Sequence, residues 1–187
     1  MTRSRHGRTR SEVAEVGVRA AGAHARGFSL FELIVTLSVA AILATIAIPS
    51  YRSLVQSNGL TTQTNELVGA LNYARATAVA RGTTVTLCSS ADRLTCRNDA
   101  DWSAGWLIYT ASAGATPGNG AEVLRAHRAL SGGITLTAST DQPIDFNSSG
   151  FAMSGHSVKA SAEDTANTQT VCIAATGRVA TVNAAGC

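Results

Sequence analysis

The side chain with the clearest chemical potential is Glu32, a lone carboxylate at the start of an uncharged and strongly apolar segment, residues 33–48. A charged side chain inside a bilayer-embedded helix costs about 3 kcal/mol on insertion scales, so Glu32 requires a cationic partner if it enters a membrane. The nearest cations are Arg26 and, if the chain is cleaved after Gly27, the new α-amine of Phe28, about one helical turn away. That amine could neutralise Glu32 of the same chain or of a neighbouring chain. The alternative is that Glu32 lies at the headgroup level and keeps its charge in water.

The uncharged segment is long enough to cross a membrane, because residues 33–51 approach the roughly 20 residues that a spanning helix needs. An ordinary secretory signal is a poorer match, since its apolar core is about 7–15 residues long and a small-x-small cleavage site follows it. Here residues 44–47 offer no such site, whereas the small residue Gly27 precedes the segment. The segment is therefore expected to stay in the mature chain. Positive charge ahead of it predicts a cytoplasmic N-terminus and a periplasmic remainder. Six arginines carry this charge: Arg3, Arg5, Arg8, Arg10, Arg19 and Arg26.

Four cysteines suit an oxidising compartment. They are Cys88, Cys96, Cys172 and Cys187. Their spacing does not match zinc or redox motifs, and only two histidines lie beyond residue 27, so no metal or cofactor is expected. The pairs Cys88–Cys96 and Cys172–Cys187 would close short loops, each worth about 2.5–3 kcal/mol in the chain-entropy model. Four free thiols are the alternative.

Motifs for catalysis are missing from the sequence, which has no nucleophile elbow, no HExxH and no phosphate-binding glycine loop. The chain is therefore not expected to be an enzyme. Residues 98–101 contain Asp99 and Asp101, and Asp92 is close in sequence, so these oxygens could bind calcium. The simpler interpretation is a hydrated loop held by Cys96.

A long helix is predicted for residues 28–80. Pro49 is expected to bend it, because proline removes a backbone hydrogen bond in the helix interior. Gly59 is expected to be a softer joint. Beyond it, apolar residues recur at helical spacing and predict a stripe packed against a globular head. The stripe is Leu60, Leu67, Leu71, Ala74 and Ala78. Arg81 and Gly82 form a typical helix end.

Short β-prone runs follow the helix, separated by turn residues. They cover residues 83–88, 105–110, 122–129, 134–138, 143–146, 156–161, 169–174 and 178–182. Loops are expected at 114–120 and 161–168. The fold class is therefore α+β, with a long N-terminal transmembrane helix packed on an antiparallel β-sheet or sandwich head. Trp106 is expected in the core of this head. The alternative is that Trp102 or Trp106 anchors a partner.

The string Gly27-Phe28-Ser29-Leu30-Phe31-Glu32-Leu33 resembles the processing site of type IV prepilins and type II secretion pseudopilins. The resemblance implies that a prepilin peptidase removes a leader, residues 1–27, by cleaving after Gly27, and that it N-methylates Phe28. It also implies that Glu32 pairs with the N-terminal amine of an adjacent subunit during assembly. The mature chain would then be a helix, residues 28–80, with a membrane span at about 33–51, and a periplasmic head, residues 81–187.

The head strings resemble the GspH/FimT group of minor pilins and pseudopilins. They are residues 85–89 with Cys96, residues 102–109, residues 144–150 and residues 172–179. The resemblance implies a type IV pilin-like fold and a structural subunit of a type IV pilus or a type II secretion pseudopilus. It implies a single-pass protein of the cell inner membrane, whose partners are prepilin peptidase, other pilins or pseudopilins and the inner-membrane assembly platform.

DNA binding is one alternative. Members of this group implicated in DNA uptake carry a C-terminal Gly-Arg-x-Arg pattern, but here Gly177-Arg178-Val179-Ala180 lacks the second arginine, which leaves Arg178 as the candidate contact. The full chain carries +3, but the leader holds six Arg against two Glu, a net +4, so residues 28–187 carry −1. This charge does not favour phosphate contacts.

Two further alternatives concern the role of the N-terminal apolar segment. One is a membrane-tethered periplasmic binding protein that never polymerises. The other is a secreted enzyme released by signal peptidase, whose mature chain would begin after residue 48.

Overall fold

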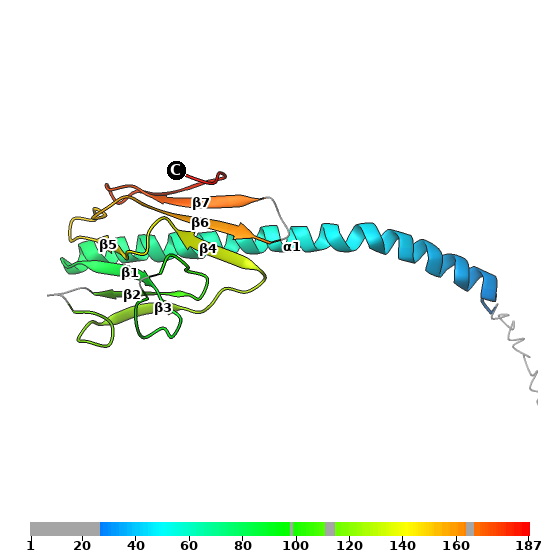
Figure 1. Ribbon diagram of the computed structural model, residues 1–187, viewed down its shortest axis with the longest axis horizontal. Coiled ribbons are helices and arrows are strands. Elements are labelled where there is room, and N and C mark those ends of the chain that lie inside the picture. The colour runs from blue at the N-terminus through cyan, green and yellow to red at the C-terminus, as the bar shows by residue number, and fades with distance from the viewer. Residues whose placement is uncertain (1–26, 98, 111–114, 164–166) are drawn as a thin grey trace, which may run out of the picture. The chain divides into compact units, whose positions relative to one another are not determined.

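A computed structural model of the 187-residue chain describes residues 27–97, 99–110, 115–163 and 167–187. The expected leader, apart from Gly27, lies outside the described residues. The chain divides into two units between Ala41 and Ile42, inside the long helix, and the units are described separately (Figure 1).

The helix α1 runs from Leu30 to Arg81, close to the predicted range. Pro49 lies inside it, and helical structure continues on both sides; the bend expected there stays a prediction. The helix ends as the sequence predicts. Gly82 adopts φ +61°, and the Thr83 N–H donates to the Ala78 carbonyl at 3.2 Å, which is the bond that spans five residues in a Schellman cap.

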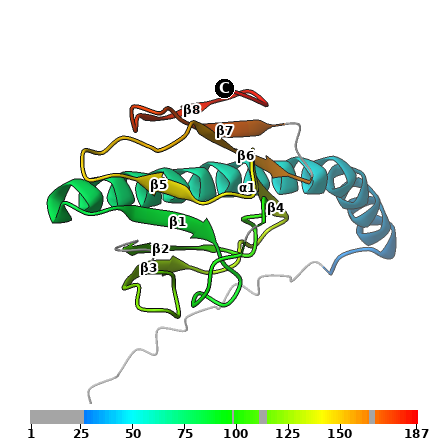
Figure 2. The same cartoon turned by 60° about the vertical axis from the view of Figure 1, so that its left-hand side comes forward.

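The remaining elements are eight strands that form two antiparallel four-stranded sheets, in the orders β3-β2-β1-β5 and β4-β6-β7-β8 (Figures 1 and 2). Their bounds are β1 Val85–Ser89, β2 Trp106–Thr110, β3 Val123–His127, β4 Ile134–Ala138, β5 Ile144–Phe146, β6 His156–Ala162, β7 Thr168–Ile173 and β8 Val179–Val182. Each predicted run overlaps one strand. The predicted α+β class, with a long helix packed on antiparallel sheets, is confirmed.

The core lies where one face of α1 meets the inner faces of both sheets. Figures 1 and 2 show β7 and β8 on one side of α1 and β2 and β3 on the other. All five residues of the predicted stripe are buried, and one cluster joins them to residues of both sheets, including Phe146 and Val158. The stripe also contains Thr64, whose hydroxyl donates to the Leu60 carbonyl at 2.8 Å. That local bond satisfies the hydroxyl and lets a polar residue occupy a buried position.

Gly59 has a packing role, and the softer joint expected there stays a prediction. A Cβ at this position would lie 3.0 Å from Ile134 Cδ1, so glycine permits close approach between α1 and β4.

A junction of Arg75, Gly150 and Gly177 ties α1 to the two sheets. Arg75 Nε donates to the Gly150 carbonyl at 2.9 Å, and a Cβ at Gly177 would lie only 1.9 Å from the same oxygen. Gly177 also has φ +76°. The two glycines belong to the segments 144–150 and 172–179, which are far apart in the sequence. The folded head brings these segments together beside α1.

Two disulfides join Cys88 to Cys96 and Cys172 to Cys187, the pairing that short loops favoured. The first holds the loop after β1, and the second holds the segment after β8 against β7.

The loops differ in detail from their predicted form. Pro117, inside the predicted loop 114–120, is buried; Gly114 lies outside the described residues. The predicted loop 161–168 is shorter, because β6 extends to Ala162 and β7 starts at Thr168.

Replacing Gly177 by alanine should destabilise the head more than the same change at Gly82. Both glycines have positive φ, but the Gly82 Cβ position has nothing within 4 Å. We expect Gly82→Ala to lower the free energy of unfolding by about 1–2 kcal/mol through left-handed strain. Gly177→Ala should lower it by about 2–5 kcal/mol, because overpacking against Gly150 adds to the strain. Urea unfolding of the full chain in detergent measures both changes, and equal losses would contradict the close contact.

Candidate functional site

The N-terminus of α1 places Glu32 in the first helical turn. Ser29 precedes the helix, and its hydroxyl accepts a hydrogen bond from the Glu32 backbone N–H at 3.2 Å. Ser29 is therefore an N-cap and Glu32 occupies the third helical position, as in the S-x-x-E pattern of a capping box. A carboxylate at this end also complements the helix dipole. That Ser29 caps α1 was not predicted from the sequence, although a serine three residues before a glutamate is the sequence pattern of such a cap.

Phe28 lies one residue before the cap and is exposed, and the Glu32 side chain is exposed as well. The first turn of α1 therefore leaves the Glu32 carboxylate open to a cation, whether from its own chain or from another. Pairing of Glu32 with a Phe28 amine stays a prediction.

The first half of α1 exposes its apolar side chains. Leu30 is 79% exposed, Ile46 71% and Val55 50%. An 18-residue window of this helix has a mean hydropathy of 2.3 with none of it buried, which by length and composition is enough to cross a membrane. Such a surface needs lipid or another protein to cover it, because water is a poor solvent for a patch of this size.

The carboxylates considered for calcium order their own loop. Asp92 accepts hydrogen bonds from the backbone N–H groups of Leu94 and Thr95, and these bonds hold the pKa of its carboxyl well below the usual range. The Asp99 carboxylate pairs with Arg97 at 2.5 Å. In the described ranges, which leave out Asn98, no three side chains of His, Cys, Asp or Glu gather as a metal site.

Asp101 has a similar local role. Hydrogen bonds from the side chain and the backbone N–H of Ser103 lower the pKa of its carboxyl.

The later basic residues lie on different elements. Arg178 is exposed in the turn between Gly177 and β8, Lys159 is on β6, and Arg125 and Arg128 belong to β3 and the segment after it. DNA contact at Arg178 stays a prediction.

Both tryptophans are buried, which excludes either as an exposed anchor and agrees with a core position for Trp106. Trp102 is 1% exposed and Trp106 is 2% exposed. The Trp106 indole stacks on the His127 ring, with centroids 3.9 Å apart and an interplanar angle of 3°.

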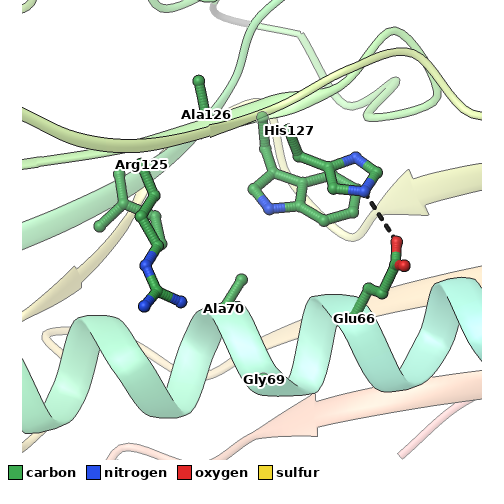
Figure 3. A pocket seen from close by; sticks show the side chains of 8 residues that line it. Glu66, Gly69, Ala70, Arg125, Ala126 and His127 are labelled. Atoms are coloured by element: carbon green, nitrogen blue, oxygen red, sulfur yellow. Dashed lines mark hydrogen bonds and ion pairs between the residues drawn. The ribbon is translucent and has the colours of Figure 1, made fainter.

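A small pocket of about 280 Å³ lies between α1 and strands β2 and β3 (Figure 3). We call it the Gly69 pocket; it is lined by Glu66, Gly69, Ala70, Trp106, Ile108, Arg125, Ala126 and His127. His127 Nε2 and Glu66 Oε2 are 2.7 Å apart, and the Arg125 guanidinium lies 3.7 Å from the centre of the Tyr73 ring. Sequence reasoning did not single out this pocket, because its parts come from three elements that only the fold brings together.

Comparisons with known proteins agree with these features. A family model described as type II transport protein GspH matches residues 63–186, and one described as a prokaryotic N-terminal methylation motif matches residues 22–48. No curated protein matches the chain.

Two solved crystal forms of one protein share the fold, and a third structure is less similar. The type IV minor pilin FimU of Pseudomonas aeruginosa is 20% identical, with a TM-score of 0.55 over 68% of this chain and 90% of that chain. A second crystal form of FimU gives 18% identity and a TM-score of 0.52 over 65% and 91%. The minor pseudopilin EpsH of Vibrio cholerae is 11% identical, with a TM-score of 0.48 over 66% and 95%.

The GspH model covers nearly all of the head and the last part of α1, from residue 63, while the methylation motif covers the exposed start of α1 up to residue 48. The chain therefore belongs to the GspH family and is a type IV pilin-like minor subunit.

Proposed function

We propose that prepilin peptidase cleaves this chain after Gly27 and methylates Phe28, and that α1 then carries the subunit into a type IV pilus or a type II secretion pseudopilus. Before assembly the chain is a single-pass protein of the inner membrane, with its N-terminus in the cytoplasm and its head in the periplasm. The inner-membrane assembly platform extracts it, and other pilins or pseudopilins become its neighbours.

The observation that carries the proposal is the contrast between the two halves of α1. Residues of the stripe, from Leu60 to Ala78, are buried by the chain's own head, whereas large apolar side chains from Phe28 to Val55 are exposed. Lipid covers such a surface before assembly, and the helices of neighbouring subunits cover it in a fibre. A membrane-tethered binding protein needs only the first of these environments.

Glu32 supplies the specificity of assembly. Inside a bundle of apolar helices an unpaired carboxylate is costly, and a neighbour's N-terminal amine removes that cost. The N-terminal position of Glu32 on α1 suits this role, because cleavage after Gly27 would create the amine only a few residues away.

The mature N-terminus tests the processing step. N-terminal sequencing of the full chain purified from its native membrane should begin at N-methyl-phenylalanine, Phe28, because cleavage ahead of the apolar segment retains that segment. Release by signal peptidase would instead give a chain that begins after residue 48.

The charge of Glu32 tests the assembly step. We expect Glu32→Gln to abolish recovery of the subunit in sheared fibres, because the amide keeps the shape but cannot neutralise an amine. Membrane insertion and the unfolding midpoint of the head should not change, since Glu32 lies outside the head core.

Ser29→Ala is the matched control, because it removes the cap and leaves the carboxylate. This change should cost about 1 kcal/mol of helix stability and preserve fibre incorporation. Incorporation of Glu32→Gln at the wild-type level would reject the ion pair, and a wild-type chain that never enters fibres would favour a tethered protein.

A further inference from the structure

Gly69 is a glycine that the fold of the head does not require. In a helix interior glycine costs about 1 kcal/mol relative to alanine. The Gly59 position is explained by Ile134, whose Cδ1 would lie 3.0 Å from an added Cβ, but nothing lies within 4 Å of a Cβ at Gly69. Gly69 instead lines the Gly69 pocket, where the missing side chain leaves space between α1 and β3 (Figure 3).

The size and lining of this pocket suit one bulky apolar side chain. Its volume of about 280 Å³ lies just below the range of about 300–1,000 Å³ typical of small-molecule sites. Ala70, Ile108 and Trp106 contribute apolar surface to it. Pockets of this kind accept the anchor side chains that dominate protein–protein interfaces.

The charges around the pocket favour a carboxylate beside that anchor. Glu66, the acidic residue of the lining, is bonded to His127. Arg125 stacks on Tyr73 and forms no ion pair with any described residue. Arg128 lines the adjoining hollow with Glu66 and His127 and likewise has no carboxylate partner in the described ranges. An acidic group that enters the Gly69 pocket would therefore meet the Arg125 guanidinium, which has no carboxylate partner among the described residues.

Gln63 adds a requirement for a hydrogen-bond donor. It lines the adjoining hollow, and its Oε1 is buried with no hydrogen-bond partner among the described residues. It precedes Gly69 by six residues, about 9 Å along α1, which is the length of about three residues of extended chain. A polypeptide backbone supplies N–H donors at this spacing, whereas the phosphates of a nucleic acid offer only acceptors.

We propose that this groove, from Gln63 to the Gly69 pocket, binds an extended segment of a different subunit of the same fibre. The segment inserts a bulky apolar side chain over Gly69 and places an adjacent carboxylate against Arg125. The inference rests on the proposed function, because the partner is another fibre subunit.

Binding to the groove can be measured without a fibre. The chain has two tryptophans, so ¹⁵N-tryptophan labelling of the full chain in detergent gives two indole signals, one from Trp106 at the pocket and one from Trp102 as an internal control. The probe is N-acetyl-Asp-Phe-amide, and N-acetyl-Asp-Gly-amide lacks the anchor. We expect a saturable shift of the Trp106 signal with a dissociation constant on the order of 1 mM, as for a ligand of few heavy atoms.

Two variants at one position provide the specificity control. Gly69→Leu should abolish the shift, because its side chain fills the pocket without meeting another atom at Cβ, whereas Gly69→Ala adds only one methyl group and should weaken binding without abolishing the shift. A missing shift, an equal shift with both peptides or an unchanged shift in Gly69→Leu would overturn the proposal. A Trp106 signal that changes with protein concentration in the absence of peptide would assign the groove to a second copy and also overturn it.

Fibre recovery separates this inference from the proposed function. Gly69→Leu should be recovered in sheared fibres about tenfold less than Gly69→Ala, the loss expected when one anchor contact is blocked. Equal recovery would reject the docking groove and leave the proposed function intact. A wild-type chain missing from fibres would reject the proposed function, while the peptide titration would still report on the pocket.

Discussion

The structure depends on one shared surface, the buried stripe of α1 from Leu60 to Ala78. Both four-stranded sheets cover it, and a single hydrophobic cluster contains residues from all three layers. Residues 81–187 therefore do not enclose their core alone, since α1 fills the space between the sheets. Arg75 reinforces this arrangement by a hydrogen bond to Gly150, at the point where the Gly150 and Gly177 turns meet. A change in the stripe would loosen both sheets at once.

The same helix carries a second, opposite constraint. Large apolar side chains from Phe28 to Val55 are exposed, so the chain by itself presents an apolar surface whose contact with water is energetically unfavourable. The proposed function explains why such a surface persists, because in that proposal the subunit exchanges lipid for the helices of its neighbours. Under the proposed function, the carboxylate of Glu32 at the edge of this surface would select a neighbour by charge, in a medium that otherwise offers only non-directional contacts.

Features with a local pattern could be predicted from the sequence. Helical periodicity predicted the stripe of α1, and a glycine predicted its cap at Gly82. Short β-prone runs between turn residues predicted all eight strands, and the cysteine spacing predicted the two short disulfide loops. The burial of Thr64 was not predicted, because a threonine is a polar residue and only the structure shows that its hydroxyl bonds to the Leu60 carbonyl. The junction of Arg75, Gly150 and Gly177 and the stack of Trp106 on His127 could not be predicted, because they join residues distant in the sequence. The vacant space over Gly69 has the same origin, since an open pocket exists only once α1 and β3 lie side by side.

Burial of α1 between two sheets also has a mechanical consequence. A tensile load along the helix axis would act on the contacts from Leu60 to Ala78 in shear, so that many contacts resist together rather than one after another as in peeling. The Arg75 hydrogen bond would share this load, because it joins the helix to the turn that contains Gly150. In a subunit built in this way, a force applied to α1 can be transmitted to the head while the head remains folded around the helix.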